Sequence, residues 1–122
     1  MRRPQFETLV ARALDGLPEV VVAAMENLEV TIEDEPSWDV REEFGLADDE
    51  TLFGVYRGLP LTERGVSDLP LLPDRIVIYQ RPLEESFDRA DELVEEIRRT
   101  VIHEVAHYLG MEEDQIEELG YG

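Results

Sequence analysis

The strongest constraint on the fold lies in the stretch "TVIHEVAHYLG", residues 100–110. As a helix, this stretch is apolar on every side apart from His103, Glu104 and His107, so it must pass through the middle of the structure. Helical residues four apart project from one face, one turn apart. Burying imidazoles and a carboxylate without partners would cost free energy. The sequence therefore predicts a central helix whose polar residues share a common partner.

A metal ion is the partner that fits this spacing best. His103 and His107 are the only two histidines in the chain, and two imidazoles one turn apart can bind a single zinc ion. Zinc lowers the pKa of a bound water, and Glu104, next to His103, can take the proton as a general base. We therefore expect one Zn²⁺ per chain, with Glu104 as the catalytic residue. A hydrogen-bonded cluster in the core is the alternative.

A catalytic zinc site needs a third protein ligand and one open position. Gly110 allows the chain to leave the helix through a left-handed turn, which would bring the following residues back toward the metal. Glu113 lies three residues past this glycine, where related motifs place a histidine or an aspartate. We expect Glu113 to be the third ligand, and the neighbouring Asp114 is the alternative.

The whole chain has 122 residues, a length that fits one domain over residues 1–122. An amphipathic helix is predicted over residues 6–17, and a long helix over residues 86–109 with Ser86 as its N-cap. Alternating or apolar runs predict three strands. They are "LEVTIED" (28–34), "TLFGVYRG" (51–58) and "RIVIYQ" (75–80). Trp38 and Phe44 are expected to attach an irregular stretch to the core, and residues 59–73 to form a functional surface loop.

Composition narrows the possible partners. The formal net charge is −19, which repels nucleic acid and anionic membrane surfaces and tolerates basic polypeptides. The chain has no cysteine, which excludes thiolate metal sites and cysteine nucleophiles. Its longest apolar run, "VVVAAM", is too short to span a membrane, and its first ten residues lack the apolar region of a signal peptide. We expect a cytoplasmic protein.

Motifs along essentially the whole chain resemble a known family, the small bacterial zincin-like proteins sometimes called minimal zincins, which are regarded as zinc metallopeptidases. The resemblance lies in "FETLVARALDGLP", "LEVTIEDEP", "TLFGVYRGLPLTERG", "LPDRIVIYQRPL" and "VIHEVAHYLGMEEDQIEELGYG". It implies an α+β zincin-like fold, with a small mixed sheet packed on a long zinc helix. It also implies His103 and His107 as ligands, Glu104 as general base and an acidic third ligand at the position of Glu113.

Two functions are compatible with these features. One is a zinc-dependent metallopeptidase that cleaves short or unfolded peptides with a zinc-activated water. The other is a catalytically silent zinc-binding domain that holds a protein or peptide partner in its cleft. Glu104 favours hydrolysis, because a purely structural zinc site has no use for a carboxylate beside it. In the zincin fold an extended substrate lies along an edge strand. The candidates are Thr51–Arg57 and Arg75–Gln80, and we expect the strand to be Arg75–Gln80, because its alternating apolar pattern leads directly into the zinc helix. The candidates for stabilising the oxyanion are Tyr56, Arg57, Tyr79 and Tyr108, and for each of them a structural role is the alternative that we favour.

Overall fold

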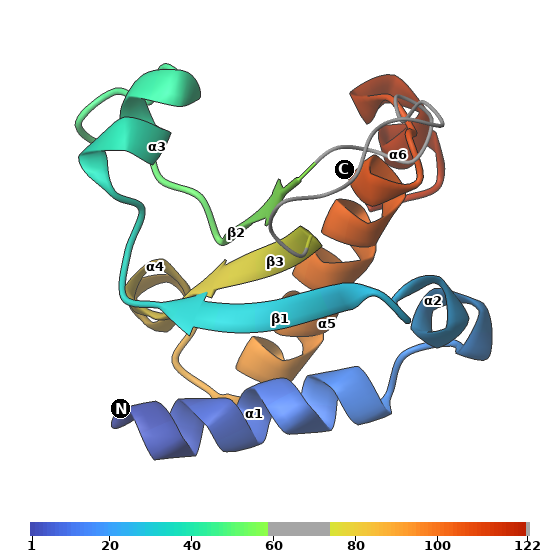
Figure 1. Ribbon diagram of the computed structural model, residues 1–122. Helices are drawn as coiled ribbons and strands as arrows, with labels where there is room; N and C mark the ends of the chain where they lie inside the picture. Colours follow the sequence, from blue (N-terminus) through green and yellow to red (C-terminus); the bar gives the residue numbers. More distant parts are fainter. Residues whose placement is uncertain (59–73, 122) are drawn as a thin grey trace.

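The computed structural model describes residues 1–58 and 74–121, so the predicted loop over residues 59–73 lies outside the described part. The described residues form a small mixed sheet with helices around it (Figure 1). The elements follow in the order α1 (Arg3–Asp15), α2 (Glu19–Ala24), β1 (Leu28–Glu33), α3 (Trp38–Glu43), β2 (Gly54–Arg57), β3 (Asp74–Tyr79), α4 (Gln80–Ser86), α5 (Ala90–Tyr108) and α6 (Glu113–Glu118). This is the α+β arrangement that the sequence predicts.

The sheet has the strand order β1-β3-β2. Strand β3 runs parallel to β1 and antiparallel to β2. The expectation that Arg75–Gln80 is the edge strand is therefore wrong, because β3 occupies the centre of the sheet and β2 lies at an edge among the described strands. Strand β3 is apolar on both faces, with Ile76 and Ile78 on one and Val77 and Tyr79 on the other. Such a continuous apolar run is typical of a strand that is buried on both sides.

The main core lies between one face of the sheet and the helices α1 and α5. In this core, residues spaced three and four apart on α1 and α5 pack against alternate residues of the strands. The most buried core residues are Phe6, Ala13, Ile76, Ile78, Leu83, Ile97 and Val101. The predicted spacing of α1 is confirmed, and so is the alternation of β1, whose Leu28, Val30 and Ile32 face this core. The central position of α5 follows from its apolar second half.

The long helix predicted over residues 86–109 is interrupted in the structure. Ser86 is the last residue of α4 instead of the N-cap of α5, and Phe87 adopts an extended conformation with φ −134° and ψ 127°. The ring of Phe87 packs on that of Phe53, with 5.8 Å between the ring centroids. Because Phe87 makes this contact in an extended conformation, the chain does not continue as a helix after Ser86, and α5 begins at Ala90.

The expectation that Trp38 and Phe44 pack into the core is wrong. Trp38 is 81% exposed at the start of α3, and Phe44 follows the end of α3 at the surface.

Residues 1–58 and 74–121 contain no helix that is both long enough and apolar enough to cross a bilayer.

Candidate metal centre

The two histidines lie on one face of α5 with their rings turned toward each other. The ring centroids of His103 and His107 are 4.9 Å apart, and the Nε2 atoms are 3.2 Å apart. Both side chains are partly buried. The spacing of four residues along the helix therefore places two potential metal-binding nitrogens side by side, as the sequence predicts.

Glu113 reaches both histidines because α5 ends in a tight turn. Gly110 has φ +87°, and the amides of Gly110 and Met111 donate to the carbonyls of His107 and Ala106. This pattern is the Schellman motif, in which glycine tolerates the left-handed conformation. The turn reverses the chain, so that α6 starts beside α5. Glu113 Oε1 then lies 2.7 Å from His107 Nε2 and 3.2 Å from His103 Nε2.

Asp114, the alternative third ligand, points elsewhere. Its Oδ1 accepts a hydrogen bond from the backbone amide of Gln115 within α6. No contact of Asp114 with either histidine is found in the described part of the chain. The geometry therefore brings Glu113, and not Asp114, to the two imidazoles.

The three donor atoms fit a zinc ion in their spacing. Zinc–ligand distances of 2.0–2.1 Å in a tetrahedron imply about 3.3 Å between neighbouring ligand atoms. The two Nε2 atoms and Glu113 Oε1 form a triangle with sides of 3.2, 3.2 and 2.7 Å. Two nitrogens and one carboxylate oxygen are also donors that zinc prefers. A tetrahedron with three protein ligands keeps its fourth position open, as in catalytic sites.

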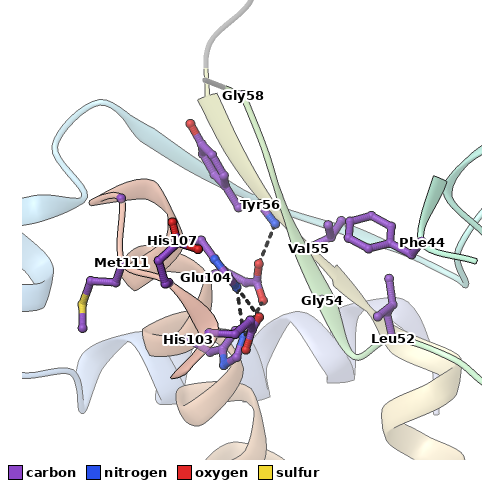
Figure 2. A pocket seen from close by; sticks show the side chains of 13 residues that line it. Phe44, Leu52, Gly54, Val55, Tyr56, Gly58, His103, Glu104, His107 and Met111 are labelled. Atoms are coloured by element: carbon purple, nitrogen blue, oxygen red, sulfur yellow. Dashed lines mark hydrogen bonds and ion pairs between the residues drawn. The ribbon is translucent and has the colours of Figure 1, made fainter. Parts of the chain in front are cut away.

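Glu104 lies beside this triangle, between the histidines and the edge strand (Figure 2). The residue is 8% exposed. Its Oε1 accepts a hydrogen bond of 2.8 Å from the backbone amide of Tyr56 in β2, while its Oε2 lies 3.8 Å from His103 Nε2. Burial raises the pKa of Glu104, and the nearby imidazoles of His103 and His107 offset this only in part. One oxygen is therefore anchored to the strand, and the other faces the candidate metal position.

The outer nitrogen of His103 also has a partner. Nδ1 lies 2.6 Å from the backbone carbonyl of Tyr121. Because a carbonyl can only accept, Nδ1 carries the proton, and in the neutral ring Nε2 then has its lone pair free for a metal. Burial lowers the pKa of His103, but the bond to Tyr121 and the carboxylates of Glu104 and Glu113 outweigh it, so that the pKa is raised.

The family comparison agrees with this geometry. Residues 25–122 match the sequence profile of the zincin-like metallopeptidases, which is most of the chain and includes the whole candidate site. The chain belongs to the zincin-like metallopeptidase family. The predicted resemblance and the predicted fold class are thereby confirmed.

A solved structure similar to this zincin-like chain is a conserved hypothetical protein from Thermus thermophilus. The two share 21% sequence identity with a TM-score of 0.55, over 98% of this chain and 97% of the other. At this identity the similarity supports the fold alone. No protein with curated annotation matches the chain.

The candidate metal centre of this zincin-like chain opens into a cleft of about 680 Å³. His103, Glu104 and His107 line one part of it. Glu112 and Glu113 add two further acidic side chains to the lining. Apolar side chains line other parts, and Figure 2 places Phe44 and Leu52 on one side of β2 and Met111 on the other. The site therefore borders a space large enough for part of a peptide, with edge strand β2 passing beside it.

The four candidates for stabilising the oxyanion differ in their positions. Tyr79 is buried with Val77 on the sheet face away from α5, and Arg57 forms an ion pair with Glu43. Tyr108 is buried, and its ring packs on that of Tyr56 at 5.6 Å. Of the four, only Tyr56 lines the cleft.

Two groups of the site were missed by the sequence analysis, the amide of Tyr56 and the carbonyl of Tyr121. Both are backbone groups, which every residue carries, so no residue type marks them. Gly120 was the one available signal, because a glycine after an amphipathic segment indicates a reversal of the chain.

Proposed function

We propose that this chain is a zinc-dependent metallopeptidase in which His103, His107 and Glu113 hold the metal and Glu104 is the general base. The observation that carries the proposal is the convergence of four groups. Three donor atoms form a triangle of zinc-like dimensions, and the buried carboxylate of Glu104 lies beside it at the wall of a cleft.

A zinc ion at this position would supply Lewis acidity, lowering the pKa of water and polarising the carbonyl of the scissile peptide bond. Glu104 takes the proton from the attacking water and passes it to the leaving amine. Its Oε1 stays on the amide of Tyr56, which keeps Oε2 directed toward the reacting water.

The edge strand β2 supports a peptide as the substrate. Phe53 accepts a hydrogen bond from Tyr79 of β3, and Tyr56 donates away from β3 to Glu104. Because backbone groups alternate in direction along an antiparallel strand, the amide and carbonyl of Gly54 point to the same outer side as the amide of Tyr56. An extended substrate can pair with the outer edge of β2 as an added strand. Strand β2 lies within Thr51–Arg57, the second of the two candidate strands, whereas the preferred candidate Arg75–Gln80 contributes the central strand β3.

The chain has a formal net charge of −19, which attracts basic peptides and repels acidic ones. We therefore favour neutral or basic peptides and unfolded polypeptides as substrates. We propose that the protein binds neither nucleic acid nor a membrane. We also propose that it is located in the cytoplasm. The alternative function is a catalytically silent domain that binds zinc and holds a peptide in the same cleft.

The variant Glu104→Gln separates the two functions. We expect wild-type protein to contain one zinc per chain by metal analysis and to cleave members of a peptide library. Glu104→Gln keeps the size of the side chain, so zinc content should stay the same while cleavage falls by at least about 100-fold. Glu7→Gln, at an exposed position of α1, is the matched control and should behave as wild type.

Two outcomes would contradict the peptidase. Wild-type protein that binds zinc and cleaves no peptide would favour the silent domain. Loss of zinc from Glu104→Gln would mean that Glu104 is a ligand and not the base.

A further inference from the structure

Both ends of the short helix α6 contact the same histidine. Its first residue, Glu113, lies at Nε2 of His103, and Tyr121, just beyond its last turn, lies at Nδ1. The contact at Nδ1 is the shorter one, at 2.6 Å. The two ring nitrogens of His103 are therefore both engaged by one short helix and the turn that follows it.

The position of the Tyr121 carbonyl follows from how α6 ends. Gly120 has φ +89°, and the amides of Gly120 and Tyr121 donate to the carbonyls of Glu117 and Ile116. This is a second Schellman motif, like the one at Gly110. Ile116 is 1% exposed, so the helix that carries the turn is anchored in the core. The chain direction after α6 is thus set by the turn at Gly120.

Arg99 holds this turn against α5. Its Nη2 donates to the carbonyl of Gly120 at 2.9 Å, and its guanidinium lies 5.6 Å from the centre of the Tyr121 ring, a cation–π distance. Arg99 precedes His103 by four residues, so both project from one face of α5. Although the chain has 30 acidic residues, no ion pair of Arg99 occurs within the described ranges. Its contacts there are with the turn.

We propose that the Gly120–Tyr121 turn, held by Arg99, is a positioning device for the metal ligand His103. The Tyr121 carbonyl keeps the proton of the neutral ring on Nδ1 and fixes the ring plane, so that the lone pair of Nε2 is directed at the metal. Tyr121 and Arg99 act through His103 and touch no reacting atom. The inference rests on the proposed role of His103 as a zinc ligand.

Gly120→Ala tests the turn directly. An added Cβ would have no atom within 4 Å, so the variant strains only the left-handed backbone. Gly45 offers a matched control, because it also has positive φ, +61°, and open space around its Cβ, and it follows α3. We expect Gly120→Ala to raise the zinc Kd by about 10-fold or more, as loss of outer-shell partners does. Gly45→Ala should keep the wild-type Kd, measured by competition with a chromophoric chelator.

Arg99 variants test the support of the turn. Arg99→Met removes both contacts and should weaken zinc binding, while Arg99→Lys retains a donor for the Gly120 carbonyl and should recover part of the affinity. Arg12→Met, at an exposed position of α1, makes the same change in charge and should have no effect.

A spectroscopic measurement separates positioning from general loss of structure. In the metal-free protein above the pKa of imidazole, long-range ¹H–¹⁵N spectra should show His103 protonated on Nδ1. Gly120→Ala should shift this ring toward a mixture of tautomers, and Gly45→Ala should leave it unchanged. Equal zinc affinity and equal tautomers in the two glycine variants would overturn the inference while leaving the proposed function intact. A wild-type protein without zinc binding would instead overturn the proposed function, and this inference with it.

Discussion

At the scale of single residues, Glu104 and His103 each have one side-chain atom bound to a backbone group and another directed toward the candidate site. Glu104 gives one oxygen to the amide of Tyr56 and keeps the other beside His103. His103 gives Nδ1 to the carbonyl of Tyr121 and keeps Nε2 for the cluster with His107 and Glu113. In both cases a backbone group orients the side chain.

At this scale we predict that Glu113, and not Asp114, is the third zinc ligand. Glu113 is largely exposed, yet its pKa is lowered, because the charge of His103 and the hydrogen bond from His107 outweigh the effect of desolvation. Because Glu113 Oε1 lies 2.7 Å from His107 Nε2 and 3.2 Å from His103 Nε2, Glu113→Ala should weaken zinc binding by more than the roughly 10–100-fold typical of an outer-shell loss. Asp114→Ala, which removes the neighbouring carboxylate, should leave it unchanged. Zinc affinities from chelator competition decide between the two, and the reverse order would make Asp114 the ligand.

At the scale of elements, the site depends on how closely β2 approaches α5. Gly54 allows this approach: a Cβ at Gly54 would lie 2.7 Å from Cγ2 of Thr100 on α5 and 2.9 Å from the carbonyl oxygen of Val77 on β3. Both distances are shorter than real contacts. The absence of a side chain at Gly54 thus lets β2 pair with β3 and bring the amide of Tyr56 within 2.8 Å of Glu104.

We predict that Gly54→Ala moves β2 away from the helix. The crowding should lower the free energy of unfolding by about 1–3 kcal/mol in urea denaturation. Peptide cleavage should fall because Glu104 loses its anchor, while zinc content stays at the wild-type level. Adding Thr100→Ser removes the crowding methyl group but keeps the hydroxyl that donates to Glu96, so part of the stability should return. Wild-type stability of Gly54→Ala would contradict this account of the packing.

At the scale of the whole molecule, the candidate metal centre is made of residues from two parts of the structure. His103 and His107 belong to α5, which packs against α1, β2 and β3. Glu113 belongs to α6, which holds its place through the turn at Gly110 and the buried Ile116. A bound metal would therefore link α6 to α5, and the free energy of metal binding would add to the stability of the folded state.

Metal removal should accordingly lower the melting temperature. At free zinc 100-fold above its Kd, binding stabilises the folded state by about 2.7 kcal/mol, which is roughly 10 °C for a chain of this size. Scanning calorimetry with zinc and then with excess chelator measures the difference. The double variant His103→Ala/His107→Ala should show no response to zinc. A response of equal size in this variant would place the metal elsewhere.

The features that the sequence alone determined are those set by local geometry. The pairing of His103 with His107 follows from the helical repeat, and the reach of Glu113 follows from the short distance along the chain to Gly110. The tertiary structure decided the rest, because it depends on which distant segments meet. Phe87 leaves the helix to pack on Phe53, and β3 takes the centre of the sheet. The partners of Glu104 and His103 are backbone groups 48 and 18 residues away, and no periodicity in a sequence reports such pairs, because every residue carries the same amide and carbonyl.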